Sequence, residues 1–345
     1  MERGHDEPTA SKAWSFRATG ATRALGIHMT VVQVVTAADE RYVDQACVLA
    51  RSLQWSQPDE VDLVVLGSGW SNRSIERLKE SGGHRVHTRV VDPADRRTSL
   101  VKPLRYGFPA ATMYGVLAPQ LQLFDNVERL VYLDADTIVR DDLGLLLRRD
   151  LSTPVAAVVD AHVSLMGMPS MWRAWREEHV DPLAPYLNTG VMAIDVGSWR
   201  ELGITDQVFE LLAKYRLPCV DQDALNLTLR GHFDRLEPRW NLMPYHLMRL
   251  LRTSDLLETE DAIAQALSDP GIIHFHRSFL GKPWQVGCTH PASGLWREIA
   301  RSVGVGRRSV SVRDLLRIVG ARVAGMSSLD PRCEAMRDFR IADTV

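Results

Sequence analysis

The stretch VYLDADT, residues 131–137, places two aspartates directly after a short apolar run. Such a run is typical of a buried strand, and residues i and i+2 at the end of a strand point the same way. Asp134 and Asp136 can therefore reach one cation. Carboxylates at strand ends also lie where open α/β sheets bind ligands. The plain structural alternative is a pair of solvated turn aspartates or helix caps.

Short β-branched runs alternate with helical stretches on both sides of this motif. Strands are expected at residues 31–38, 61–66, 86–91, 130–133, 155–159, 190–194 and 272–275. Helices are expected at residues 42–54, 74–80, 109–124, 206–215 and 223–230. Buried apolar runs separated by helices indicate parallel strands with crossover helices. The first half of the chain therefore predicts a nucleotide-binding α/β sheet.

The composition is that of a globular protein without a dominant charge. The chain has 345 residues, 45% of them hydrophobic, which is enough to fill a sizeable core. Its 41 basic and 43 acidic residues give a net charge of −2, so no global field draws it to nucleic acid. The 4 cysteines are widely spaced without a C-x-x-C pair, which favours a reducing, cytoplasmic location over a disulfide framework.

A second group of candidate ligands lies in IIHFHRSFLGKPW, residues 272–284. His274 and His276 share one face of an extended segment, and two carboxylates plus an imidazole suit manganese better than magnesium or calcium. A histidine in such a strand can equally be a hydrogen-bonded core residue. The adjoining Gly281 lets backbone approach a ligand closely, and Lys282 supplies a point charge for phosphate.

A third feature is YLNTGVMAID, residues 186–195, followed by DQDALN, residues 221–226. Asn188 and Gly190 mark a turn into a strand, whereas the acidic DQD triplet lies where a helix begins. The plain alternative makes Asp221 an N-cap and Asp223 a favourable charge in the first helical turn.

Five segments in this order resemble glycosyltransferase family 8. They are TAADERY (36–42), VYLDADTIV (131–139), YLNTGVMAID (186–195), VDQDALN (220–226) and IHF through KPW (273–284). The resemblance spans about residues 30 to 285. It implies a GT-A fold, which is a Rossmann-like mixed sheet flanked by helices. It also implies a UDP-sugar donor, a hydroxyl acceptor, Mn²⁺ (with Mg²⁺ as the alternative) and retention of anomeric configuration.

The resemblance also assigns residues. The metal ligands would be Asp134, Asp136 and His274, with His276 as the alternative because the His274–Lys282 spacing is two residues longer than usual in the family. The residues expected to contact the nucleotide and its diphosphate are Ala37, Asp39, Tyr42, Ala135, Gly281 and Lys282. The residues expected to line the donor sugar are Asn188, Thr189, Gly190, Asp221 and Gln222, and Asp160 falls where the family meets its acceptor.

Two further departures from the family pattern concern donor binding. Arg41 stands where the family usually has a small polar residue. Gly115 stands about where the family carries an arginine that reaches the donor, and Lys102 or Arg105 in the preceding loop can substitute for it.

For catalysis, oxygen atoms of Asp221, Gln222 or Asp223 can stabilise an oxocarbenium-like sugar. Gln222 and Asp223 are candidate nucleophiles, although same-face attack without a covalent intermediate is the preferred mechanism. Two alternatives are a catalytically impaired nucleotide-sugar-binding protein and a haloacid-dehalogenase-like phosphatase, whose D-x-D-x-T motif also follows an apolar strand.

Three divisions of the chain are expected. Residues 1–28 predict a poorly ordered extension, residues 29–290 the GT-A catalytic domain, and residues 291–345 a helical C-terminal extension. A Pro- and Met-rich insertion at 161–185 is expected to be irregular and able to cover a substrate. The basic amphipathic helix at 307–322 can pack on the domain or make peripheral contact with a membrane, and no transmembrane segment is expected.

Overall fold

The structure is a computed structural model that describes residues 31–93, 110–167, 172–306, 309, 311–326 and 328–340. The predictions for residues 1–28, Lys102 and Arg105 lie outside the described residues.

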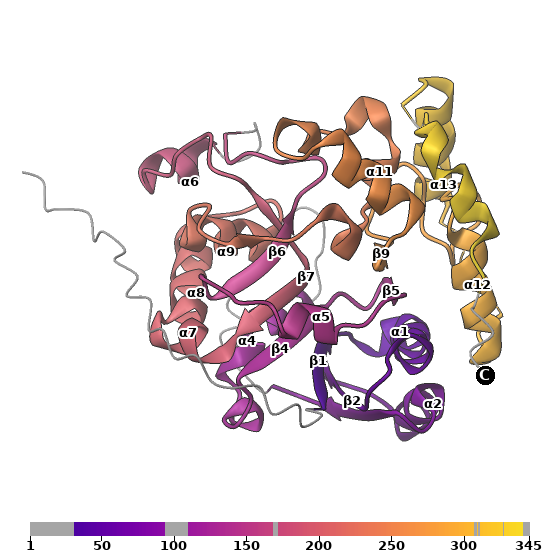
Figure 1. Cartoon of the computed structure of the whole chain (residues 1–345), viewed down its shortest axis with the longest axis horizontal. Helices are drawn as coiled ribbons and strands as arrows, with labels where there is room; N and C mark the ends of the chain where they lie inside the picture. The colour runs from indigo at the N-terminus through magenta and orange to yellow at the C-terminus, as the bar shows by residue number, and fades with distance from the viewer. Residues whose placement is uncertain are drawn as a thin grey trace, which may run out of the picture.

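A mixed seven-stranded sheet forms the centre of the described chain, in the order β3-β2-β1-β4-β7-β6-β8 (Figure 1). Its strands are β1 (Val32–Ala37), β2 (Val61–Leu66), β3 (Val86–Val91), β4 (Arg129–Leu133), β6 (Val155–Val159), β7 (Leu187–Asp195) and β8 (Asp234–Arg235). Strands β1 to β4 are parallel, as predicted, whereas β7 runs antiparallel to both β4 and β6. The mixed sheet expected from the family resemblance is therefore confirmed.

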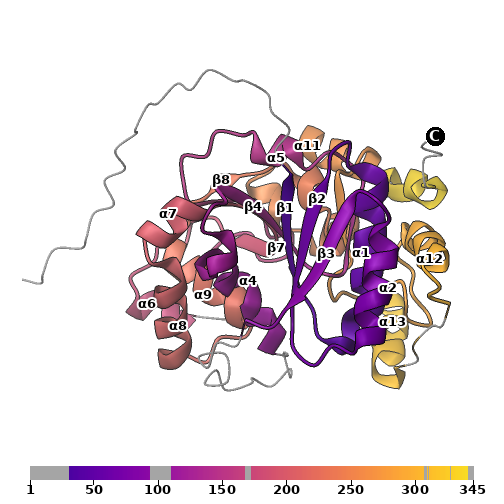
Figure 2. The ribbon, with the colours of Figure 1, turned by 90° about the horizontal axis from the view of Figure 1, so that it is seen from below.

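Helices cover both faces of this sheet (Figure 2). One face packs against α1 (Val43–Ser56) and α2 (Asn72–Gly82), and the other against α8 (Ile204–Lys214) and α9 (Val220–Leu229). Side chains of β1 alternate between the two layers, since Val34 belongs to the α1 side and Val35 to the α8 and α9 side. Burying both sets of apolar side chains is what holds the three layers together.

The remaining elements are short or lie near the C-terminal end. The α-helices are α4 (Tyr114–Leu117), α5 (Gly144–Leu147), α6 (Trp172–Glu177), α7 (Val196–Glu201), α10 (Pro244–Leu247), α11 (Glu260–Ser268), α12 (Ser293–Ser302) and α13 (Val312–Val323). The 3-10 helices are η1 (Glu40–Tyr42), η2 (Ala110–Met113), η3 (Ala118–Gln120), η4 (Gln122–Phe124), η5 (Pro238–Asn241), η6 (Arg249–Leu251), η7 (Ser254–Leu256) and η8 (Pro331–Asp338).

The helix predicted at residues 109–124 is wrong as a single element. The described part of this stretch is a succession of single turns, η2, α4, η3 and η4. Pro119 has no N–H to give to a helical ladder, and Leu121 takes an extended backbone with φ −73° and ψ 136°, which ends the turn before it. Gly115 lies here against the Tyr132 ring, and a Cβ at Gly115 would be 2.7 Å from the Tyr132 Cε2 atom.

The strand predicted at residues 272–275 forms, but it joins a separate two-stranded sheet. Its described extent is β9 (Ile272–His274), which pairs antiparallel with β5 (Thr137–Val139), a strand that sequence reasoning missed. In this register Thr137 pairs with His274. The pairing carries the histidine motif to the end of the D-x-D turn, although the two segments are far apart in sequence.

The insertion at 161–185 is less irregular than expected. It contains α6, and Leu165 bridges Pro185 in antiparallel fashion. The indole of Trp175 is buried and meets the Tyr186 ring edge-on, with centroids 6.2 Å apart, so α6 is attached to the core.

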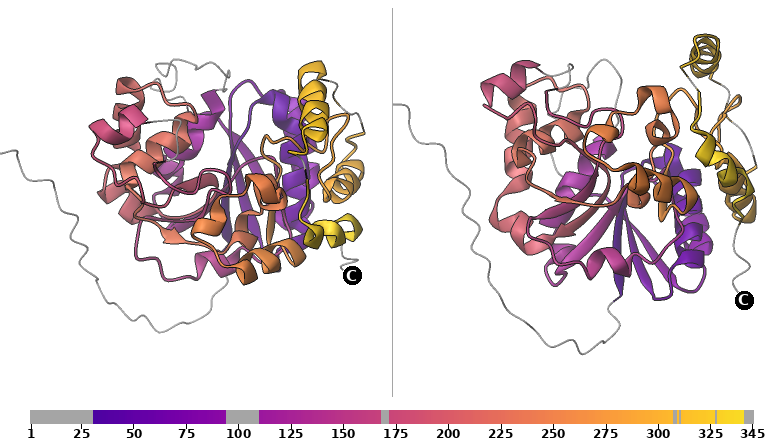
Figure 3. Two further views of the ribbon diagram at one scale, coloured as in Figure 1. Left: turned by 90° about the horizontal axis from the view of Figure 1, so that it is seen from above. Right: turned by 45° about the horizontal axis from the view of Figure 1, so that its top comes forward.

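The C-terminal helices extend the core on the side of α1. Figures 1 and 3 show α12 and α13 at the outer edge of the molecule, and α12 lies next to α1. Leu295 and Trp296 of α12 share a hydrophobic cluster with Ile273 and Phe275, so this region is packed on the β9 segment. A boundary near residue 290 between catalytic domain and extension stays a prediction. Among the described helices, none has the length and apolar character needed to span a bilayer.

Candidate active site

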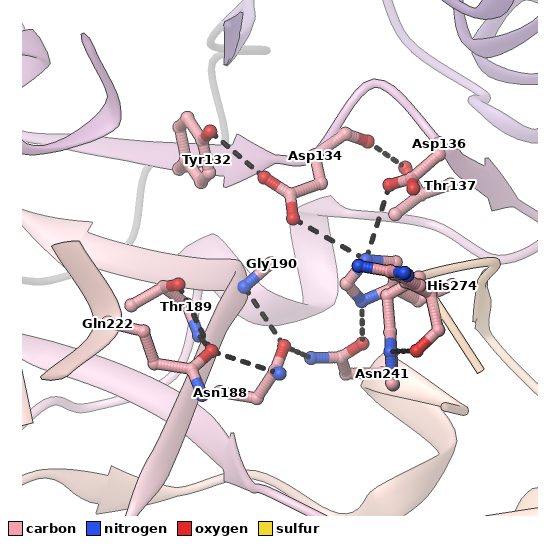
Figure 4. Close-up of polar contacts among 12 residues, drawn as sticks. Tyr132, Asp134, Asp136, Thr137, Asn188, Thr189, Gly190, Gln222, Asn241 and His274 are labelled. Atoms are coloured by element: carbon pink, nitrogen blue, oxygen red, sulfur yellow. Dashed lines mark hydrogen bonds and ion pairs between the residues drawn. The ribbon is translucent and has the colours of Figure 1, made fainter. Parts of the chain in front are cut away.

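The turn between β4 and β5 sets the two aspartates side by side. The Asp134 N–H donates to the Gly190 carbonyl of β7 at 2.8 Å, which anchors the end of β4 to its neighbour. The Thr137 hydroxyl donates back to the Asp134 carbonyl at 2.8 Å and closes the turn. The Tyr132 hydroxyl donates to Asp134 Oδ1 at 3.0 Å. Both carboxylates therefore point to the same side of the sheet edge (Figure 4).

His274 lies opposite these carboxylates. Its Nε2 atom is 3.4 Å from Asp134 Oδ2 and 3.3 Å from Asp136 Oδ1. Its Nδ1 atom is 3.0 Å from Asn241 Oδ1, which accepts from Nδ1–H and so directs Nε2 at the carboxylates. Asn241 in turn donates to Asn188 Oδ1 at 2.9 Å (Figure 4). Sequence reasoning missed Asn241, because nothing in its local sequence distinguishes it from a turn residue.

These three side chains fit a divalent cation. Asp134, Asp136 and His274 each offer one ligand atom, and the three atoms lie within 4.8 Å of one another. The buried His274 Nε2 atom has no hydrogen-bond partner among the described residues. Gly190 leaves room for the group, because a Cβ there would lie 2.2 Å from His274 Cε1 and 3.0 Å from Asp134 Oδ2. Two carboxylate oxygens and one imidazole nitrogen are a donor set that transition-metal dications accept.

Cationic neighbours keep this corner charged. Burial alone raises the pKa of Asp136, but the ammonium of Lys282, which contacts Asp136 Oδ2, and the His274 imidazole bring that pKa well below its usual value. Burial likewise opposes charging of His274, yet Asp134 and Asp136 raise its pKa to about 9. The charge of Asp136 also raises the pKa of Lys282. The Asp136 carboxylate therefore stays ionised, because the positive charges of Lys282 and His274 lie beside it.

His276, the alternative ligand, lies outside this group of three. Its ring meets the Tyr245 ring with centroids 5.6 Å apart, and Tyr245 stacks in turn on His162 at 4.2 Å. Burial and the charge of His274 lower the pKa of His276 to about 4. The imidazole at the apolar end of β9 rather than the one with the usual family spacing thus faces the aspartates.

A second polar network lies beside the metal-ligating group, at the start of β7. The Asn188 amide donates to Asp160 Oδ2 at 2.8 Å and to Gln222 Oε1 at 3.1 Å. The Thr189 N–H donates to the same Gln222 oxygen at 3.2 Å (Figure 4). Gln222 Nε2 reaches Asp160 Oδ2 at 3.3 Å. Asp160, which follows β6 and was expected at the acceptor, is thus brought together with residues of β7 and α9 that were expected at the donor sugar.

Asp223 serves the start of α9. The Cys219 N–H donates to its Oδ2 atom at 2.6 Å, and the Tyr186 hydroxyl donates to Oδ1. Its side chain is buried, and burial raises its pKa to about 7 against the opposing effect of these two hydrogen bonds. Asp223 does lie in the first turn of α9, but its raised pKa means that it is not the fixed charge of the plain alternative. The N-cap alternative for Asp221 is wrong, because α9 begins at Val220 and its N-cap is Cys219.

The backbone just before Asp221 is strained. Val220 has φ +40°, a left-handed value that a β-branched residue rarely adopts. Burial and the charge of Asp134 raise the pKa of Asp221 well above its usual value, which places that carboxyl within electrostatic reach of the metal-ligating group.

A cavity of about 530 Å³ extends from the aspartates toward β1. Its lining includes the predicted Ala37, Asp39, Tyr42, Ala135 and Lys282. Sequence reasoning gave no role to Trp284, which lines the cavity and meets Tyr42 edge-on with ring centroids 6.4 Å apart.

The structure explains why glycine is needed at residue 281 and what the Arg41 side chain does. Gly281 has φ +74°, and a Cβ there would lie 2.6 Å from Ile318 Cδ1 of α13, so helix packing and backbone conformation both require glycine. Arg41 does not line the cavity. Its side chain is 76% exposed and pairs with Asp39 Oδ2 at 2.6 Å, which orients the Asp39 carboxylate.

Known proteins share these features. A family model for glycosyl transferase family 8 matches residues 33–287. General stress protein A of Bacillus subtilis (strain 168) is 28% identical over 276 residues, which cover 76% of this chain and 90% of that protein. A lipopolysaccharide 1,2-glucosyltransferase of Escherichia coli (strain K12) is 24% identical over 296 residues, covering 81% of this chain and 79% of that protein.

Among solved structures, galactosyltransferase LgtC in complex with donor and acceptor sugar analogues matches with a TM-score of 0.62 at 22% identity. The match covers 82% of this chain and 98% of that one. The sheet order and this match define a GT-A fold. The family match over most of the chain then shows that the protein belongs to glycosyltransferase family 8 and is a glycosyltransferase. This membership excludes the haloacid-dehalogenase-like alternative.

Proposed function

We propose that this glycosyltransferase moves a hexose from a UDP-sugar to a hydroxyl acceptor with retention of configuration, in a manganese-dependent reaction. One observation carries the proposal. The metal-ligating group and the Asn188–Gln222 network are joined by a single hydrogen-bonded path, from His274 through Asn241 to Asn188. A donor with its diphosphate at the aspartates would therefore have its sugar at that network.

The charges suit cleavage of a glycosyl phosphate. Breaking the bond between the anomeric carbon and phosphate places negative charge on the leaving UDP and oxocarbenium character on the sugar. A divalent cation held by Asp134, Asp136 and His274 would act as a Lewis acid toward the diphosphate. Lys282, in contact with Asp136, adds a second positive charge at the same place. The Gln222 side-chain oxygen lies beside Asn188 and Thr189, at the network where we place the sugar.

The surroundings of the candidate nucleophiles support attack from the leaving-group face. Asp223 is buried and held by Tyr186 and the Cys219 N–H, so its oxygens are engaged in the protein. The Gln222 carbonyl oxygen already accepts hydrogen bonds from Asn188 and Thr189. An amide in this position orients the donor and stabilises positive charge, whereas a direct nucleophile needs an unengaged oxygen.

The donor sugar we propose is glucose, galactose or an N-acetyl derivative. One relative is a lipopolysaccharide glucosyltransferase and one structural neighbour is a galactosyltransferase. Asp160 is the residue we assign to the acceptor hydroxyl. Burial alone raises its pKa, but the His276 ring, the Asn188 amide and the N–H groups of Val163 and His162 lower it, which keeps Asp160 ionised as a hydrogen-bond acceptor.

The test is hydrolysis of a panel of UDP-hexoses with and without Mn²⁺, repeated with Asp136→Asn. We expect a manganese-dependent rate that the substitution lowers about 10²- to 10³-fold, the usual effect of removing one electrostatic group from an active site. Asp269→Asn is the matched control, because Asp269 is exposed on the surface and, within the described residues, forms its ion pair with Arg239. Equal rates for Asp136→Asn and wild type, or no effect of Mn²⁺, would refute the metal assignment.

A catalytically impaired nucleotide-sugar-binding protein is the second candidate. Gly115 lies against Tyr132 at the place where the family resemblance expects an arginine. Stabilisation by UDP and Mn²⁺, with neither hydrolysis nor transfer across a broad acceptor panel, would favour binding without turnover.

Peripheral contact of α13 with an anionic membrane, on the cytoplasmic side, also stays a prediction. The outer face of α13 carries an exposed apolar stripe, formed by Val312, Leu316, Val319 and Val323. Cosedimentation of the full chain with phosphatidylglycerol vesicles, lost in Leu316→Glu, would support it, and equal cosedimentation of both would refute it.

A further inference from the structure

Helix α13 brings arginine side chains to the cavity that is lined by the two aspartates of the D-x-D turn. Arg313 and Arg317 of α13 line this cavity together with Arg277, which follows β9. The same cavity is lined by Asp134, Asp136 and Lys282. A helix near the C-terminal end of the chain therefore supplies one wall of the site, opposite in charge to the aspartates.

Specific contacts fix α13 in this position. Its Ile318 side chain packs over Gly281, and Asp314 Oδ2 accepts a hydrogen bond from Gln285 Nε2 at 2.8 Å. Gln285 Oε1 accepts in turn from the Lys282 N–H at 3.0 Å. These contacts attach α13 to the segment that carries Lys282. The fold therefore fixes the position of the α13 arginines relative to Lys282.

The positive charges in this wall are poorly compensated. Arg317 Nη2 lies 3.5 Å from Asp314 Oδ1, which is the only carboxylate at ion-pair distance from Arg317 among the described residues. In the same described part of the chain, no carboxylate pairs with Arg277 or Arg313. Arg317 Nε is buried without a hydrogen-bond partner there.

Burial and the like charge of Arg277 both lower the pKa of Arg317, so the cluster carries an electrostatic cost that an anion would relieve. Guanidinium groups that converge on a cavity with donors to spare match the oxygens of a phosphate group, which they bind in a bidentate manner.

We infer that Arg277, Arg313 and Arg317 form an anion subsite for a phosphate group, added to the active site by α13. This inference rests on the proposed function, since a transferase site offers two sources for that phosphate. One is the donor, through its diphosphate. The other is an acceptor that itself carries a phosphate group next to the hydroxyl that is glycosylated.

Calorimetric titration of the full-length protein in Mn²⁺ tests this with two probes, UDP and then inorganic phosphate added to the UDP-saturated protein. The variants are Arg317→Gln and Arg313→Gln, with Arg322→Gln as the control, because Arg322 is on α13 but does not line the cavity. Arg317→Lys keeps the charge without the bidentate geometry, and thermal melting verifies that each variant folds.

If the donor supplies the phosphate, Arg317→Gln weakens UDP binding about 10- to 100-fold, whereas binding of uridine is unchanged. If the acceptor supplies it, UDP binding is retained and binding of inorganic phosphate to the UDP complex is lost. Arg322→Gln behaves as wild type in both cases. Wild-type binding of both probes by folded Arg317→Gln and Arg313→Gln would overturn the inference.

The two hypotheses fail differently. Manganese-dependent turnover of a UDP-hexose with no effect of the arginine variants on either probe leaves the proposed function standing and removes the subsite. Loss of phosphate binding in Arg317→Gln, in a protein that turns over no UDP-hexose, removes the proposed function and retains the subsite.

Discussion

Two aspartates in neighbouring parts of the active site, Asp136 and Asp223, are both buried, but their pKa values shift in opposite directions. Burial alone raises the pKa of Asp136 and of Asp223. Lys282 and His274 reverse that effect at Asp136 and bring its pKa well below the usual value. Asp223 has only the Tyr186 hydroxyl and a backbone N–H, and its pKa stays at about 7. At these two positions the difference is made by a cation in contact rather than by depth of burial.

On the proposed function, this difference separates two tasks in one site. The group of Asp134, Asp136 and His274 would supply the negative charge that a dication needs, and the hydrogen-bonding network around Gln222 would hold the sugar. The charge of Asp134 is among the causes that raise the pKa of Asp221, so Asp221 is electrostatically coupled to the aspartate pair. Four substitutions would break or sharpen this comparison.

The largest expected effect is on the pH dependence of stability in Asp223→Asn. An ordinary aspartate has a pKa of about 3.9, so between about pH 4 and pH 7 the folded state holds a proton on Asp223 that the unfolded state releases. Stability from this group is complete below pH 4 and is lost as the pH rises through 7, by up to roughly 4 kcal/mol.

Urea unfolding of the asparagine variant should therefore lack this decline, while Asp269→Asn retains it. Parallel pH profiles for Asp223→Asn and wild type would mean that the Asp223 carboxyl is ionised in the folded protein at neutral pH.

Gly190→Ala has the next largest expected effect, because Gly190 lies in β7 directly against His274 and Asp134. The added Cβ would lie 2.2 Å from His274 Cε1, so the imidazole must move away from the aspartates. We expect Mn²⁺ affinity, measured by calorimetry, to fall about 10- to 100-fold. Gly197→Ala is the matched control, since its nearest contact would be an ordinary 3.6 Å from Asp195 Oδ1. Unchanged Mn²⁺ affinity in Gly190→Ala would contradict the position assigned to His274.

Asn241→Asp should have a smaller effect, which is confined to the network of Asn188 and Gln222. An aspartate keeps an acceptor for His274 Nδ1–H but cannot donate to Asn188 Oδ1. We expect Mn²⁺ affinity within a few-fold of wild type and a roughly 10-fold lower kcat for UDP-hexose hydrolysis. Asn241→Ala, which removes both hydrogen bonds, should lower Mn²⁺ affinity as well. If Asn241→Asp lost metal affinity as severely as Asn241→Ala, the metal-ligating group and the network around Gln222 would not be separable.

The smallest expected effect is that of Arg41→Ala. The Arg41 side chain is 76% exposed, lies outside the cavity lining and acts only by pairing with Asp39. An exposed ion pair contributes about 0 to 1 kcal/mol, so UDP affinity should change less than about fivefold. A larger loss would mean that Arg41 contacts the nucleotide directly.

Local sequence patterns predicted every strand of the main sheet except β8, and they indicated most of the residues that lie together in the candidate site. The apolar runs predicted the parallel strands β1 to β4, since a buried strand has a strong period-two or continuous apolar signal. The D-x-D turn and the NTG and DQD segments were found because each combines unusual polar residues with a strand end or a helix start. His274 was preferred over His276 from its position within the apolar strand, and it is the histidine that lies with the two aspartates.

What sequence reasoning missed depends on contacts between distant segments. Strand β5 is three residues long and exists because β9 pairs with it. Asn241 has no local signal, and its function arises only from the positions of His274 and Asn188. The arginines of α13 were read as the polar face of an amphipathic helix, because nothing in residues 312–323 indicates that this face meets a cavity lined by distant parts of the chain.

The β5–β9 pairing also has a consequence for biosynthesis. Asp134 and Asp136 leave the ribosome long before His274, and the imidazole reaches them only when β9 has been made and has paired with β5. An N-terminal fragment that ends before β9 would carry both aspartates and none of the site's imidazole. During synthesis the metal-ligating group is thus completed late, so tight Mn²⁺ binding would report that the chain has folded past residue 274.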